Sequence, residues 1–137
     1  MTQIFFYSIN EGGIERKLMV ACKLTEKAFA LGHQVFIQSS NDEQLRVLDE
    51  LLWKFDPSSF LPHEVGNKQN CSIQLGGEVS ESQKGILINL SGEACIKHHQ
   101  FSRINEIVGP DEQSLLSGRS NYRFYQTQGL PPETYKI

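Results

Sequence analysis

Short apolar runs alternate along this chain with segments whose apolar residues recur at helical spacing, and this alternation limits the possible folds more than any other feature. Apolar runs of this length predict strands. They are Gln3–Ser8, Gln34–Ser39, Cys71–Gly76, Lys84–Ser91 and Phe101–Gly109, the last of which we expect to be the final strand. Strands that alternate with helices are joined by right-handed crossovers. The sequence therefore predicts an α/β fold, a mainly parallel sheet with helices on both faces.

Three segments have the apolar period of a helix. The predicted helices begin at Ile14, Asn41 and Pro110 and end near Gly32, Trp53 and Gly129. Proline suits the first turn of a helix, and the two acidic residues after Pro110 favour the helix dipole. The segment Lys54–Asn70 contains two prolines, so we predict that it is irregular.

Length and composition are those of an ordinary globular protein. A chain of 137 residues, 39% hydrophobic and 21% charged, corresponds to one domain, which we expect to span residues 1–137. A net charge of −3 argues against a protein whose main task is to grip nucleic-acid phosphates. We find no signal peptide, and no apolar run approaches the length of about 20 residues that spans a bilayer. We therefore expect a cytoplasmic protein without a membrane partner.

The cysteines and histidines do not predict a metal site. Three cysteines, an odd number, are far apart, which indicates reduced thiols, and we expect Cys22, Cys71 and Cys95 in the core. His98 and His99 are neighbours, so on a strand they would point to opposite faces. No spacing typical of zinc ligands occurs, and surface histidines are the favoured interpretation.

Catalytic signals are also weak. A phosphate-binding loop needs glycines at the start of a helix, whereas Gly12–Gly13 stands without a G-x-G-x-x-G or Gly-Lys-Ser/Thr pattern and favours a plain turn. His63 is a candidate general base, but no nucleophile or orienting acid accompanies it, so a histidine packed in a proline-fixed loop is favoured. Asp49 and Glu50 are typical of a solvated helix face. We predict no catalytic residue and no cofactor.

The C-terminal helix carries arginines beside aromatic residues. On a helical period Leu115, Arg119, Tyr122 and Gln126 share a stripe, with Arg123 beside it. Two guanidinium groups flanking a tyrosine suit a carboxylate, because each can bind it bidentately while the ring supplies an apolar wall. The alternative is a helix whose arginines lie on its solvated face.

A second aromatic group follows the middle helix. Trp53, Phe60, Leu61 and Pro62 lie close together at a helix end and in an irregular loop. Tryptophan is enriched at interface hot spots, so these residues are candidates to anchor a partner. Alternatively, the loop folds back and buries them as a small satellite core.

At these two stretches the chain resembles the chi subunit of bacterial DNA polymerase III holoenzyme, the accessory protein of its clamp loader. The resemblance covers nearly the whole length. It rests on "IFFYS", "LDELLWKFDPSSFLPH", "GILINLS" and "RSNYRFYQTQG". It implies a Rossmann-like fold in a protein that is neither an enzyme nor a nucleotide binder.

The resemblance also implies two partners. One is the psi subunit, which tethers chi to the clamp loader, and the psi-facing residues would be Trp53, Phe60, Leu61 and Pro62. The other is the acidic C-terminal tail of single-stranded DNA-binding protein (SSB), which ends Asp-Phe-Pro-Phe. Its binding residues would be Arg119, Tyr122 and Arg123, with Val108 and Leu115 at the pocket edge. DNA would be contacted only indirectly.

The chain departs from the family pattern in two places. Some relatives carry a basic residue one turn before the first arginine, where this chain has Leu115. The stretch Gly66–Lys84 aligns poorly and is predicted to be a variable loop around a strand. A nucleotide- or small-molecule-binding Rossmann-like enzyme is the alternative function, and direct DNA binding, which predicts a steep salt dependence, is a third.

Overall fold

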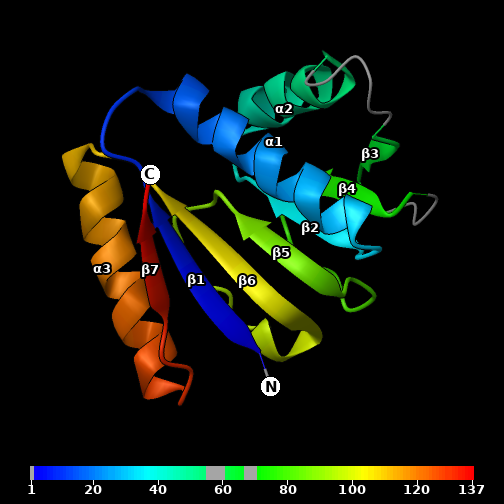
Figure 1. Ribbon diagram of the computed structural model, residues 1–137. Coiled ribbons are helices and arrows are strands. Elements are labelled where there is room, and N and C mark those ends of the chain that lie inside the picture. The colour runs from blue at the N-terminus through cyan, green and yellow to red at the C-terminus, as the bar shows by residue number, and fades with distance from the viewer. Residues whose placement is uncertain (1, 55–60, 67–70) are drawn as a thin grey trace.

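The structure is a computed structural model that describes residues 2–54, 61–66 and 71–137 (Figure 1). Its elements follow one another as β1 (Gln3–Ser8), α1 (Ile14–Ala30), β2 (Val35–Gln38), α2 (Asp42–Lys54), β3 (His63–Val65), β4 (Ile73–Gly76), β5 (Gly85–Asn89), the short 3-10 helix η1 (His98–Gln100), β6 (Phe101–Val108), α3 (Glu112–Thr127) and β7 (Glu133–Lys136). The strands form one seven-stranded sheet in the order β3-β4-β2-β5-β6-β1-β7. Every neighbouring pair is parallel, which confirms the predicted α/β fold.

Helices cover both faces of this sheet, with α1 and α2 on one side and α3 on the other (Figure 1). Because helices cover both faces, the sheet has a hydrophobic core on each side, and successive side chains of β5 point into these two cores in turn. Ile86 and Ile88 pack with the buried residues of α1 and α2, whereas Leu87 packs in a second cluster with Tyr125 of α3. The Rossmann-like arrangement implied by the family resemblance is therefore present.

Two helix starts follow from local chemistry. Gly12 has a φ of +86°, a left-handed conformation that glycine adopts without strain, and the chain turns there into α1. The Gly12–Gly13 pair therefore forms a turn, as favoured from the sequence. At α3 the side chain of Asp111 accepts a hydrogen bond from the Ser114 amide at 3.0 Å, which caps the helix.

Two strands were not predicted. β7 follows α3, so the expectation that Phe101–Gly109 holds the final strand is wrong. All four residues of β7 are exposed, and it pairs only with β1, so its sequence lacks the apolar pattern of a buried strand. β3 has three residues inside a segment predicted to be irregular, and it pairs in register with β4.

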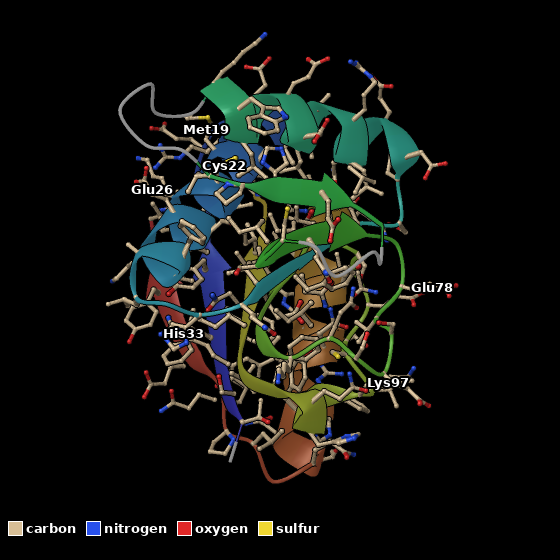
Figure 2. All side chains as sticks on the ribbon, turned by 90° about the vertical axis from the view of Figure 1, so that its right-hand side faces the viewer. Met19, Cys22, Glu26, His33, Glu78 and Lys97 are labelled. Atoms are coloured by element: carbon tan, nitrogen blue, oxygen red, sulfur yellow. The ribbon has the colours of Figure 1, made fainter. Side chains whose placement is uncertain are left out.

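The cysteines lie largely as predicted. Cys22, on α1 (Figure 2), and Cys95 are buried, and burial raises the pKa of their thiols to about 12 and about 11. Cys71 is only half-buried, because it precedes β4 at the sheet's outer side, so its expected core position is wrong. His98 and His99 lie in η1 rather than on a strand, with His99 exposed. No helix among the described residues is long and apolar enough to cross a membrane.

Candidate functional site: a groove along the C-terminal helix

A groove of about 360 Å³ runs between α3 and the strands β1, β6 and β7. It is lined by Phe6, Ser8, Val108, Leu115, Gly118, Arg119, Tyr122, Arg123, Gln126 and Thr134. All five residues assigned above to tail binding are among these, and so is the last member of the predicted helical stripe. The helical period therefore placed the stripe correctly, and the fold adds strand residues opposite it.

The floor of the groove is aromatic. The ring of Tyr122 lies 5.4 Å from that of Phe6, measured between centroids, and the two planes are tilted by 51°. The Tyr122 hydroxyl donates a hydrogen bond to the carbonyl oxygen of Pro132 at 3.3 Å. Because both ends of this side chain have partners, the ring presents a fixed apolar surface to the groove.

A glycine brings α3 close to the sheet at this point. A Cβ atom added at Gly118 would lie 3.1 Å from both methyl carbons of Val108, which is tighter than ordinary van der Waals contact. Glycine therefore lets the helix rest directly on β6, whereas a larger residue would require Val108 or the helix to shift by a few tenths of an ångström. Val108 forms one edge of the groove, while Leu115, 38% exposed, forms another.

The rim of the groove is cationic. Arg119 and Arg123 are both exposed on α3, and none of the residues that line the groove is acidic. Within the described part of the chain, no carboxylate lies within 4.0 Å of either guanidinium. An apolar floor beside two arginines without carboxylate partners fits a ligand that combines a hydrophobic side chain with a negative charge.

The second candidate region lies at the end of α2. Trp53 is 52% exposed, and its ring lies 4.4 Å from the ring of His63, measured between centroids. His63 is buried, with Nδ1 2.7 Å from the Leu61 carbonyl oxygen and Nε2 3.0 Å from Asp49 Oδ1. The packed histidine favoured from the sequence is therefore confirmed. Asp49 is not simply solvated, because it pairs with this ring across 14 positions of sequence.

The other residues of this region differ in exposure. Leu61 is only 2% exposed and belongs to the core beneath α1 and α2, whereas Pro62 is half-buried. Phe60 lies outside the described residues. Of the four residues predicted to face psi, Trp53 therefore offers the largest described surface, whereas Leu61 is buried and holds His63 through its carbonyl oxygen.

A polar cluster lies beneath α3. Glu106 of β6 is buried, and its Oε2 accepts hydrogen bonds from Tyr125 Oη and Asn89 Nδ2, each at 2.7 Å. Tyr125 Oη in turn accepts one from the Cys95 amide at 2.9 Å. Burial raises the pKa of the Glu106 carboxyl to about 7, although these hydrogen bonds favour its ionised form. The cluster therefore ties α3 to β5 and β6.

This cluster borders a cavity of about 380 Å³ at the carboxyl ends of β5 and β6. Ligands of open α/β sheets bind at such ends, so this cavity is where the enzyme alternative would place a nucleotide. Lys17 and Asn121 also line it, and burial lowers the pKa of Lys17. A buried carboxyl at this place opposes a phosphate. Among the described residues no group of three or more potential metal ligands occurs.

Several groove residues were not predicted from the sequence. Phe6 and Ser8 come from β1, and Thr134 comes from β7. The aromatic run of β1 contained the signal for Phe6, since alternate residues of a strand share a face. Thr134 had no comparable signal, because its strand is short and exposed.

Comparison with known proteins identifies the family of this chain. Residues 1–133 match the family model described as "DNA polymerase III chi subunit, HolC". A protein of Pseudomonas aeruginosa named DNA polymerase III subunit chi is 34% identical, covering 100% of this chain and 98% of the relative. The proteins of that name from Haemophilus influenzae and Escherichia coli are 27% and 26% identical over 96% and 86% of this chain and 95% and 84% of their own. The chain therefore belongs to the DNA polymerase III chi subunit family.

Proposed function

We propose that this chain is a non-catalytic bridge that binds the psi subunit at the end of α2 and the acidic tail of SSB in the α3 groove. Family membership gives the coarser function, an accessory role in DNA replication as a component of the DNA polymerase III holoenzyme. The bridge would work in the cytoplasm at the replication fork. It would connect the clamp loader to DNA that is coated with SSB, so that the contact made by the α3 groove reaches DNA through a protein tail.

One observation carries the proposal for the tail. The five residues that the family resemblance assigns to tail binding line a single groove that has an aromatic floor, a cationic rim and no acidic lining residue. In this pocket Arg119 and Arg123 would meet the terminal carboxylate and the aspartate of an Asp-Phe-Pro-Phe tail. Tyr122 would pack against a phenylalanine ring of the peptide.

The proposal for psi rests on Trp53. A half-exposed tryptophan at a helix end is an uncommon surface residue and a frequent interface anchor. Its inner side is supported by His63, which is itself fixed by Leu61 and Asp49. A psi segment that covers Trp53 would therefore bind a surface that needs little rearrangement, and Phe60 and Pro62 would extend it.

The test of the tail site is fluorescence anisotropy of a labelled Asp-Phe-Pro-Phe peptide. We expect wild type to bind in the micromolar range, about −8 kcal/mol at 1 μM. Arg119→Ala should cost about 2 kcal/mol, about thirtyfold, because a carboxylate in the groove would lose its partner. Arg46→Ala is the matched control, since this exposed arginine lies on α2 and pairs with Glu43 and Glu50. Equal affinity of Arg119→Ala and wild type would refute the tail site.

The small-molecule alternative has the cavity beside Glu106 as its supporting observation. A nucleotide bound there would shift the side-chain amide resonances of Asn89 and Asn121, whereas a peptide in the groove would shift the side-chain Nε–H resonances of Arg119 and Arg123. Failure of the peptide to bind, together with such shifts, would replace the bridge with a small-molecule function.

A further inference from the structure

The sheet face opposite α3 is only partly covered. α1 and α2 lie over the β2 and β5 side of the sheet, which leaves β1 and β7 open (Figure 1). Tyr7 of β1 is half-buried and Tyr135 of β7 is 47% exposed on this face. These side chains belong neither to the α3 groove nor to the Trp53 region.

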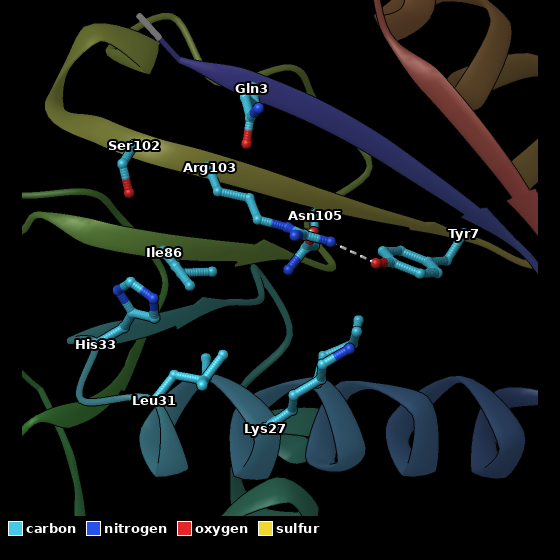
Figure 3. Close-up of a pocket in the computed structure, with 11 residues that line it drawn as sticks. Gln3, Tyr7, Lys27, Leu31, His33, Ile86, Ser102, Arg103 and Asn105 are labelled. Carbon is cyan, nitrogen blue, oxygen red and sulfur yellow. Dashed lines mark hydrogen bonds between the residues drawn. The ribbon is translucent and has the colours of Figure 1, made fainter.

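A pocket of about 220 Å³ lies where α1 meets this open face (Figure 3). It is lined by Gln3, Tyr7, Leu24, Lys27, Ala28, Leu31, His33, Ile86, Ser102, Arg103 and Asn105. None of these residues is acidic, whereas Lys27 and Arg103 approach it from α1 and β6 (Figure 3). The pocket is therefore locally basic in a chain whose net charge is −3.

Arg103 is held in one orientation. Its Nη2 donates to the Tyr7 hydroxyl at 2.6 Å and its Nε donates to Asn105 Oδ1 at 2.9 Å. Its guanidinium carbon lies 3.9 Å from the centre of the Phe5 ring. In the part of the chain that the structure describes, no carboxylate lies within 4.0 Å of it. A fixed guanidinium of this kind is suited to a phosphate oxygen, because its planar donors are already directed.

The aromatic rings continue directly from this arginine. The ring centroid of Tyr135 lies 5.6 Å from that of Tyr7 and 5.8 Å from that of Phe5, with interplanar angles of 26° and 17°. Glu133 accepts a hydrogen bond from the Tyr135 hydroxyl at 3.1 Å. That carboxylate is on β7, while Arg103 is on β6, on the other side of β1. A phosphate is therefore favoured on the β6 side and an uncharged ring beside β7.

We propose that this face binds single-stranded DNA directly, with a phosphate on Arg103 and Lys27 and a neighbouring base against Tyr135 and Tyr7. Basic grooves beside aromatic rings bind single strands in this manner, since each base has a face that can stack. The complementarity of charge and ring surface singles out this occupant. An acidic peptide would satisfy the cations but has no regular succession of rings and phosphates. The proposal does not depend on the α3 groove, which lies on the other face.

Few phosphates are contacted, so the interaction should be weak and its salt dependence shallow. Two neutralised phosphates on a single strand give a slope of log K against log salt of about −1.4. Such a contact would become effective when another site holds the DNA nearby at high local concentration. This distinguishes it from the steep dependence expected of a dedicated DNA-binding protein.

The experiment is a titration of ¹⁵N-labelled full-length protein with a short oligothymidylate at low salt. We expect shifts of the Tyr7 and Tyr135 amides and of the Arg103 side-chain Nε–H. Shifts confined to Arg119 and Arg123 would overturn the proposal, because the strand would then occupy the α3 groove. Thymidine monophosphate that binds as tightly as the oligonucleotide would also overturn it, since the pocket would then take a free nucleotide.

Variants separate local contacts from overall charge. Lys27→Glu should weaken oligonucleotide binding about tenfold, whereas Lys54→Glu, an equal change of charge at an exposed site on α2, should have little effect. Tyr135→Ala should also weaken it about tenfold but should leave binding of an abasic strand unchanged. Equal losses from Lys27→Glu and Lys54→Glu would mean that only net charge acts, and no loss from either Lys27→Glu or Tyr135→Ala would refute the site.

Discussion

The α3 groove and the Trp53 region are built in opposite ways. The groove is a hollow that one helix and three strands form together, and its two arginines reach into solvent without carboxylate partners among the described residues. At the end of α2, the half-exposed ring of Trp53 stands out among the described residues, and the ring nitrogens of His63 beneath it are already paired. A hollow suits a short flexible ligand, whereas a projecting ring suits a partner that brings its own pocket.

This difference predicts that the two sites can be lost separately. The groove depends on how α3 rests on the sheet, while the Trp53 surface depends on α2 and β3 on the other face. Sites that share no residue and no supporting element should behave additively. A change in one should therefore leave the affinity of the other partner unaltered.

The largest effect is expected for Trp53→Ala. Truncating a central interface tryptophan costs about 3 kcal/mol or more, so co-purification with psi should be lost. Peptide binding in the groove should stay at the wild-type level. Co-purification and peptide anisotropy measured on one preparation check both expectations, and Lys54→Ala, the exposed neighbour, serves as the control. If both activities disappear together, the substitution has unfolded the protein and the two sites are not separable.

A second prediction concerns the support of α3 through Glu106. Its pKa is raised from the ordinary value of 4.5 to about 7, so between these pH values the folded protein holds a proton that the unfolded chain has released. Stability from this group is complete below about pH 4.5 and is lost as pH rises through about 7, a change of about 3 kcal/mol. Urea unfolding of wild type and Glu106→Gln across this range measures it. Parallel pH profiles for the two proteins would show that Glu106 does not titrate in this way.

Gly118→Ala should have a smaller effect that is specific to the groove. The added methyl group would lie 3.1 Å from both methyl carbons of Val108 and would push α3 away from β6, at a cost of about 1 to 2 kcal/mol. We expect the variant to bind the tail peptide more weakly and to co-purify with psi as well as wild type does. Ser120→Ala, at an exposed position of the same helix, is the control. Wild-type peptide affinity in Gly118→Ala would mean that the groove does not require this close approach.

The sequence predicted the helix side of the groove better than the strand side. Arg119, Tyr122 and Arg123 follow from a helical period and from the family resemblance, both of which are local in sequence. Thr134 and the pairing of β7 with β1 depend on a four-residue exposed edge strand, which carries no burial signal. Neither the hydrophobic period nor the composition can predict a short exposed strand of this kind.

Contacts between different helices and strands could not be predicted from the sequence either. Asp49 and His63 meet across 14 positions of sequence, and Tyr7, Arg103 and Tyr135 meet only because β1 lies between β6 and β7. The order of strands in a sheet is a tertiary property that no local pattern contains. The net charge of −3 also could not predict a basic pocket without acidic lining residues, because a sum over the chain does not say where the charged residues lie.

The smallest effect is expected for Leu115→Lys, which tests whether a further cation in the groove would strengthen peptide binding. Leu115 lines the groove one turn before Arg119 and is 38% exposed, so a lysine there would point its charge to solvent beside the bound peptide. Leu115→Lys should tighten peptide binding by about 0.5 to 1 kcal/mol at low salt, the usual worth of an exposed ion pair, and this gain should fade as salt screens it. Leu116→Lys adds the same charge at a position that is 54% exposed and does not line the groove, so it should gain less. Equal gains from both variants would mean that added positive charge strengthens binding wherever it stands near the groove. A gain confined to Leu115→Lys would mean that the peptide's acidic residues lie along the first half of α3.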